Sequence, residues 1–158
     1  MNLEVQRIAP APIRKSFRVD APQDKAFNVF LRGMGRWWPA EHSVLTSPRT
    51  DVVIEPRVGG RWYETAEDGS ESQWGRVLAW DEPDRALLAW QLNADFVYDA
   101  DFETEVEVRF IPEGGGTRIE FEHRGLEAFG AAAATVAPMM DKGWGEILDL
   151  YEADAARD

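Results

Sequence analysis

The chain has 158 residues, of which 44% are hydrophobic and 29% charged, a balance typical of one globular domain with a buried core. Its 29 acidic and 17 basic residues give a formal net charge of −12, which disfavours binding to nucleic acids or anionic membranes, and the absence of cysteine excludes disulfides, thiol catalysis and cysteine-ligated zinc. Because neither a signal-peptide core nor an apolar run of the ~18 residues that a membrane helix needs is present, we expect a soluble cytoplasmic protein.

The N-terminal part is expected to hold an extended lead-in, a strand and a helix. Residues 1–12 end in alternating alanine and proline, and we expect a single domain over residues 13–156 after them. Residues 13–19 alternate well enough for a strand. Asp20-Ala21-Pro22 then supplies a helix start, since proline suits the first helical position. Residues 36–39 favour one further short turn of helix.

From residue 51 to residue 123 the hydrophobic period changes to two, which is typical of strands. Glycine, proline and acidic residues separate the alternating segments, and such short connections favour antiparallel hairpins because parallel strands need long crossovers. Apolar and charged side chains alternate most clearly in the fifth segment, which predicts one solvated and one covered face. The six predicted strands are 51–55, 61–65, 73–80, 86–92, 103–111 and 117–123.

The C-terminal part is expected to cover the sheet with a long helix. After Pro138, an apolar stripe at helical spacing predicts a helix of about 18 residues, whereas the alanine-rich residues 126–137 fit either a short helix or a loop. The stripe consists of Met140, Trp144, Ile147, Leu148, Tyr151 and Ala155. This order of elements predicts an α+β helix-grip fold, in which a curved antiparallel sheet of six to seven strands wraps round the long C-terminal helix. Facing side chains that do not close the gap would leave a cavity between sheet and helix.

A set of short motifs is spread in order over residues 13–155. They are Val19-Asp20-Ala21-Pro22, Arg36-Trp37-Trp38-Pro39, the segments 56–64, 75–77, 81–90, 104–110 and 116–119, and Gly143-Trp144 with Ile147-Leu148. This ordered set resembles the START-like (SRPBCC) superfamily, in the branch related to the C-terminal domain of the activator of Hsp90 ATPase. The resemblance implies the helix-grip fold and binding of hydrophobic or aromatic small molecules between sheet and helix. It also implies that a few relatives act as cyclases, hydrolases or chaperone activators.

The tryptophans are the first candidates for a binding site. Trp74 is expected to share its strand face with Arg76 and Trp80, Trp90 lies on the next strand, and Trp144 leads the helical stripe. Each indole alone is most simply explained as core packing with its N–H bonded, whereas together the indoles would line an aromatic pocket. Arg76 could counter a single carboxylate on a ligand.

The stretch 95–107 carries many acidic residues interleaved with Phe96, Tyr98 and Phe102. It lacks the Asp-x-Asp-x-Asp-Gly order of a calcium loop, so we interpret it as an aromatic lid rather than an ion site. The candidate ligand-binding residues are Trp37, Trp38, Trp74, Arg76, Trp90, Phe96, Tyr98, Phe102, His123, Met140, Trp144 and Tyr151.

The two histidines are the candidates for a polar contact or a base. His123 has the parity of the covered face, where it would either contact a ligand or bond to the backbone at the rim. His42 follows Glu41, which could orient it, and lies either at the pocket mouth or on the loop surface. Because two isolated histidines make a poor metal site and no nucleophile or phosphate-binding motif is present, we expect no metal and no cofactor. Glu64 and Arg76, predicted on adjacent strands, are interpreted as a structural ion pair, with a general acid/base pair as the alternative.

Three functions remain open. The leading one is binding of a hydrophobic or aromatic small molecule, uncharged or cationic, with His123, Tyr98 or Tyr151 as the polar anchor. The second is regulation of a protein partner, as the resemblance implies. The third is an enzyme of the cyclase or hydrolase kind with His42 or His123 as general base, for which no catalytic residue is assigned. Monomer and homodimer both remain open.

Overall fold

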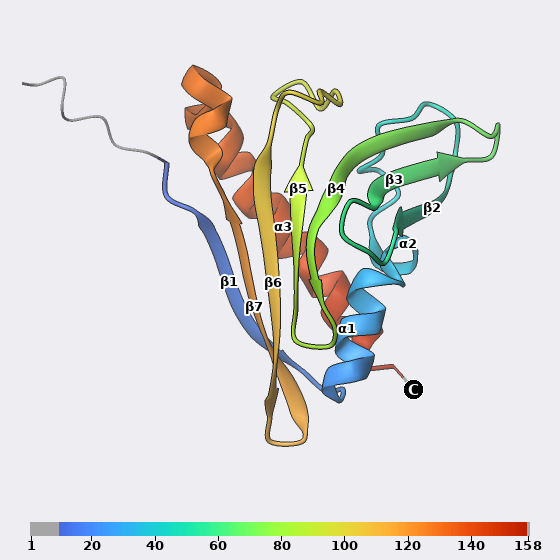
Figure 1. The fold of residues 1–158 in the computed structure, drawn as a ribbon, viewed down its shortest axis with the longest axis vertical. Coiled ribbons are helices and arrows are strands. Elements are labelled where there is room, and N and C mark those ends of the chain that lie inside the picture. The colour runs from blue at the N-terminus through green and yellow to red at the C-terminus, as the bar shows by residue number, and fades with distance from the viewer. Residues whose placement is uncertain (1–9, 158) are drawn as a thin grey trace, which may run out of the picture.

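In the computed structural model, which describes residues 10–157, one antiparallel sheet forms the framework of the molecule (Figure 1). Its seven strands lie side by side in the order β1 (Ile13–Val19), β7 (Gly116–Arg124), β6 (Thr104–Glu113), β5 (Arg85–Trp90), β4 (Glu71–Asp81), β3 (Arg61–Ala66) and β2 (Arg49–Ile54). The sheet curls, so that β2, β3 and β4 bend away from the plane of the other strands. The predicted lead-in over residues 1–12 falls mostly outside the described residues.

The helices lie on one side of the curled sheet. The helix α1 (Gln23–Leu31) and the short α2 (Met34–Trp37) connect β1 to β2 at the opposite edge, and the 3-10 helix η2 (Leu126–Ala132) leads into α3 (Ala133–Ala155). In Figure 1, α3 crosses the sheet diagonally, and its C-terminal part lies beside α1. This arrangement confirms the predicted α+β helix-grip fold.

The strands β6 and β7 alternate as predicted, because α3 covers one side of the sheet and solvent the other. Val106 and Val108 of β6 and Ile119 and Phe121 of β7 are buried on the covered side. On the opposite side, Glu107 accepts hydrogen bonds from arginines of both neighbouring strands. The covered face therefore forms the core, and charge pairs across strands occupy the solvated face.

The helix α3 is longer than predicted. It begins at Ala133 and runs for 23 residues, so Pro138 lies inside it rather than before it. Alanine is the strongest helix former, and the burial of Ala133 and Val136 stabilises the added turns. The proline removes one backbone donor from an otherwise continuous helix. From Met140 onward, the buried residues of α3 are those of the predicted stripe.

The alternation predicted for β4 is wrong. Trp74 and Val77 are both buried, whereas Arg76 reaches the surface. The register of β4 shifts in its pairing with β3 and again in its pairing with β5, and such irregularities change which residues face the core. Gly75 permits the close approach of β5, because a Cβ at this position would lie 1.7 Å from the carbonyl oxygen of Ala89.

Candidate functional site

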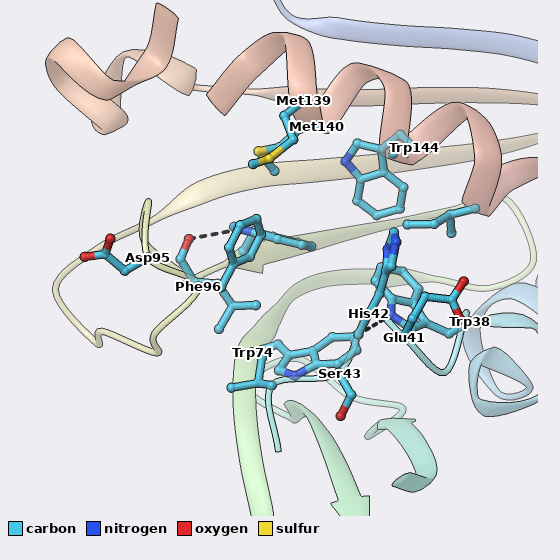
Figure 2. A pocket seen from close by; sticks show the side chains of 15 residues that line it. Trp38, Glu41, His42, Ser43, Trp74, Asp95, Phe96, Met139, Met140 and Trp144 are labelled. Atoms are coloured by element: carbon cyan, nitrogen blue, oxygen red, sulfur yellow. Dashed lines mark hydrogen bonds between the residues drawn. The ribbon is translucent and has the colours of Figure 1, made fainter. Parts of the chain in front are cut away.

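A cavity of about 520 Å³ lies between the sheet, α3 and two loops (Figure 2). Its walls are four indoles from different elements, namely Trp38 after α2, Trp74 of β4, Trp90 of β5 and Trp144 of α3. The volume is in the range usual for small-molecule sites, which are mostly apolar and contain a few polar groups. Trp74, Trp90 and Trp144, three of the tryptophans from which an aromatic pocket was predicted, line this cavity.

The remaining lining comes from the α2–β2 loop, the β5–β6 loop and the near side of α3. These residues are Glu41, His42, Ser43, Val44, Leu92, Asp95, Phe96, Met139, Met140, Gly143 and Ile147. In Figure 2, the His42 side chain extends from its loop toward α3, and Asp95 and Glu41 lie at opposite ends of the site. The polar groups of the cavity are therefore concentrated in the two loops.

The indoles pack against one another as a continuous wall. The ring centroids of Trp38 lie 5.1 Å from those of Trp74 and 5.6 Å from those of Trp144, and Trp90 lies 5.9 Å from Trp144. Tilted and edge-to-face pairs at these distances are the favoured arrangements of aromatic rings. The Arg49 guanidinium fixes the backbone beside the first indole, since it donates to the Trp38 carbonyl at 2.7 Å.

All four indole N–H groups of the wall donate to acceptors within the protein, each at 3.0 Å. The acceptors for Trp38, Trp74, Trp90 and Trp144 are the His42 carbonyl, Glu64 Oε1, the Leu92 carbonyl and His123 Nδ1, respectively. Because these donors are already bonded, the part of each indole that faces the cavity is aromatic carbon rather than a free N–H group. The four indoles are at most 5% exposed, so they form a closely packed wall.

His123 is fully buried behind the wall, with both ring nitrogens engaged. Trp144 Nε1 can donate but not accept, so His123 Nδ1 is the acceptor in this pair and the proton of the neutral ring is on Nε2. Nε2–H then donates to Thr104 Oγ1 at 2.8 Å, and the Thr104 hydroxyl donates to the Trp90 carbonyl. Burial lowers the pKa of His123 from 6.5 to about 3. His123 therefore positions two wall residues and has no free nitrogen for a ligand or for general-base chemistry.

Glu64 is a fully buried carboxylate that joins the wall to the mouth. Its Oε1 accepts from Trp74 Nε1 at 3.0 Å and from the Val44 backbone N–H at 2.6 Å, and its Oε2 accepts from the Ser43 hydroxyl. A buried carboxylate needs several such donors to remain stable. Glu64 therefore fixes one indole of the wall and the α2–β2 loop to the same point of β3.

Arg76 lies outside the cavity. Its side chain is 41% exposed, and its Nη2 donates to Glu103 at 2.6 Å. The predicted ion pair with Glu64 is wrong, because the β3–β4 register places Arg76 opposite Arg61 and Glu64 opposite Ser72. Arg76 is consequently not in a position to counter a carboxylate bound in the cavity.

Two predicted site residues belong to the core instead. Trp37 donates from Nε1 to the Val29 carbonyl, and the Tyr151 hydroxyl donates to the Ala26 carbonyl, both at 2.8 Å. Burial raises the pKa of the Tyr151 hydroxyl above its usual value. Neither residue lines the cavity, because each packs α1 against the helices beside it.

Of the three aromatic residues predicted to form a lid, Phe96 lines the cavity and the other two do not. Phe102 packs against Phe129 of η2 with ring centroids 4.9 Å apart. Tyr98 forms a backbone bridge to Leu92 and is half-buried. The structure thus brings together seven of the residues singled out from the sequence, namely His42 with Trp38, Trp74, Trp90, Phe96, Met140 and Trp144.

Several lining residues were not predicted, including Ser43, Leu92, Asp95, Met139 and Gly143. Asp95 and Met139 each directly precede a residue that was predicted, so sequence proximity was the available signal. Within residues 10–157, no group of three or more histidine or acidic side chains is arranged to hold a metal ion. No helix in this part of the chain is both long and apolar enough to cross a membrane.

The chain is similar to one known protein family. The family described as activator of Hsp90 ATPase homolog 1-like protein matches residues 20–153. Among curated proteins, no similar sequence was found.

Solved structures similar to this chain include two with substantial sequence identity. Txn09, described as an anthrahydroquino-γ-pyrone synthase, is 36% identical, with 92% of this chain and 97% of that chain covered and a TM-score of 0.65. CalC from Micromonospora echinospora, described as a self-sacrificing resistance protein, is 34% identical, with 91% and 93% covered and a TM-score of 0.70. Protein NE0264 from Nitrosomonas europaea shares 14% identity over 91% of this chain and 93% of its own, with a TM-score of 0.66, and shows the fold alone.

Proposed function

The chain belongs to the family of activator of Hsp90 ATPase homolog 1-like proteins, and from this premise we propose that it binds a planar aromatic small molecule between the sheet and α3. The observation that carries the proposal is the wall of four indoles whose N–H groups are all bonded internally. Because each of these donors already has an acceptor within the protein, contact with an apolar ring leaves none of them unpaired. Each indole is at most 5% exposed, so a ligand would touch only the part of each ring that faces the cavity and would gain further apolar contact from side chains at the mouth.

Exposed apolar side chains at the mouth support the same ligand class. Val44 is 37% exposed, Phe96 39% and Met139 49%, and all three line the cavity. Large apolar side chains gathered at one opening are typical of a binding site, because a bound apolar molecule removes them from water. The mouth and the wall thus favour the same apolar occupant.

Chemistry on the bound molecule is a second candidate function, because Txn09 is described as a synthase and its name denotes a fused-ring aromatic compound. In this chain, His42 is the imidazole that lines the cavity, whereas His123 has both nitrogens engaged. If a general base acts here, His42 is therefore the residue in reach. Regulation of a protein partner becomes the leading interpretation if no ligand binds.

Titration of the protein with fused-ring probes, such as anthraquinone and hydroxymethylanthracene, tests the proposal. Because indoles form the wall, we expect saturable quenching of tryptophan fluorescence and a melting temperature that rises with probe concentration. A flat fluorescence signal together with an unchanged melting temperature across the panel would overturn it. Conversion of a bound probe or its precursor to a new compound, lost in His42→Ala, would support the second candidate.

A further inference from the structure

The cavity has an unbalanced charge at its mouth. Among the described residues that line it, Glu41 and Asp95 carry negative charge, and no lysine or arginine is present. They lie at opposite ends of the site, on the two loops that form its rim (Figure 2). From this arrangement, and resting on the proposed function, we propose that the cavity selects aromatic ligands that carry a cationic amine over equivalent ligands that carry a carboxylate.

The two carboxylates differ from those on the outer face of the sheet. There, Glu107 pairs with Arg85 at 2.8 Å and with Arg124 at 2.9 Å, so its charge is balanced by neighbours. Among the described residues, no ion pair involves Glu41 or Asp95. Glu41 and Asp95 are exposed at the mouth, where a ligand can approach them.

Arg49 is close enough to Glu41 to interact with it electrostatically, but its position limits what it offers a ligand. Its guanidinium donates to the carbonyls of Trp38 and Pro39 at 2.7 and 3.0 Å and does not line the cavity. Arg49 thus stabilises the backbone behind the wall. A ligand carboxylate in the cavity would meet two like charges and no exposed cation.

The wall of indoles also favours a cationic ligand. Aromatic faces carry negative charge density and attract cations, most strongly in tryptophan. Because the N–H groups of Trp74 and Trp144 are bonded to Glu64 and His123, these indoles present ring atoms rather than donors that an anion could use. A ligand with an apolar ring system against the wall and an ammonium group at the rim therefore matches both parts of the site.

Three anthracene probes that differ in one substituent test the proposal, namely the aminomethyl, hydroxymethyl and carboxylate compounds. We expect the amine to bind at least about tenfold more tightly than the carboxylate at low salt, with the alcohol between them and the ratio reduced by added salt. In the double variant Glu41→Gln/Asp95→Asn, the amine-to-carboxylate ratio should fall several-fold. In the control Glu67→Gln/Asp101→Asn, which removes the same net charge at exposed positions outside the cavity, the ratio should persist.

The outcomes separate this proposal from the function on which it rests. Equal binding of all three probes, or an amine preference unchanged in Glu41→Gln/Asp95→Asn, would overturn the charge selection and leave the aromatic site intact. Failure of the neutral alcohol and the amine alike would overturn the proposed function itself. Melting curves of each variant establish that the compared proteins are folded.

Discussion

Trp144 Nε1 donates to His123 Nδ1 at 3.0 Å, and through this bond an indole of the cavity wall determines the proton position on a buried imidazole. The same imidazole donates to Thr104, whose hydroxyl reaches the Trp90 carbonyl. Two wall residues from different elements thus depend on one neutral histidine. Protonation of His123 at Nδ1 would place two donors face to face and break the bond to Trp144.

We expect His123 to make stability depend on pH. Burial lowers the pKa of its folded form from 6.5 to about 3, so between these values the unfolded chain binds a proton that the folded chain excludes. The contribution of this group to the free energy of unfolding is therefore fully present above pH 6.5 and is lost as the pH falls toward 3. The loss should approach about 1.4 kcal/mol for each pH unit.

Urea unfolding across this pH range measures the effect. The matched variant is His123→Asn, whose Oδ1 can replace Nδ1 as the acceptor for Trp144 and which does not titrate. Carboxylates affect both proteins alike, so the wild type should lose stability more steeply with acid. Parallel curves for the two proteins would show that His123 does not titrate as described.

Trp144→Phe should destabilise the protein by more than the loss of ring area alone. Phenylalanine keeps an aromatic ring in the wall but leaves His123 Nδ1 buried without a donor, which costs roughly 1–3 kcal/mol. Trp80→Phe is the control, because Trp80 Nε1 bonds to the exposed Glu82 at 3.2 Å and water can replace that contact. If chemical denaturation gave equal losses of unfolding free energy in Trp144→Phe and Trp80→Phe, the bond from Trp144 to His123 would have no special role.

Glu64→Leu should loosen the mouth of the cavity. Leucine has no acceptor, so the Val44 N–H and Trp74 Nε1–H both lose their partner, and the Ser43 hydroxyl loses its bond to the carboxylate. We expect a loss of roughly 2–3 kcal/mol in the free energy of unfolding and faster hydrogen exchange at the Val44 amide.

Glu103→Leu is the matched control for this change, since it removes an exposed carboxylate paired with Arg76 and should cost less than about 1 kcal/mol. Unchanged exchange at Val44 in Glu64→Leu would mean that the carboxylate does not hold the loop in place.

The order of elements could be predicted from the sequence because burial on one face leaves a regular pattern. In β6 and β7, Val106 and Ile119 alternate with charged neighbours, and the predicted faces are correct. The parity of His123 was also sufficient to place it on the covered side. Its bond to Trp144 could not be predicted, since that contact joins residues of two elements whose relative position depends on the whole fold.

The composition of the site could be predicted only in part, because local irregularity and tertiary packing decide which side chains reach the cavity. The register shift in the pairing of β4 with β3 falls at Trp74, between Gln73 and Gly75, and separates Trp74 from Arg76 although both have the same parity in the sequence. Trp37 and Trp38 are adjacent at the end of α2, yet one packs into the core and the other into the cavity wall. Such choices depend on the packing of α1 and α3 rather than on the local pattern.

A substitution that fills the cavity shows whether a ligand binds between the sheet and α3. Gly143 lines the cavity, and a Cβ placed on it would have no heavy atom within 4 Å, so Gly143→Leu would occupy ligand space without a clash at Cβ. Gly145→Leu is the matched control on the same helix, because Gly145 does not line the cavity and a Cβ there would approach only Lys15 Nζ, at 3.9 Å. Both changes replace a helical glycine, which favours the helix by about 1 kcal/mol.

The measurement is the affinity of the two variants and the wild type for hydroxymethylanthracene, followed by tryptophan fluorescence. We expect Gly143→Leu to weaken binding by at least about tenfold and Gly145→Leu to bind as the wild type does, with neither variant melting below the wild type. Wild-type affinity in Gly143→Leu would contradict the proposed site, because the ligand would then bind somewhere other than between the sheet and α3.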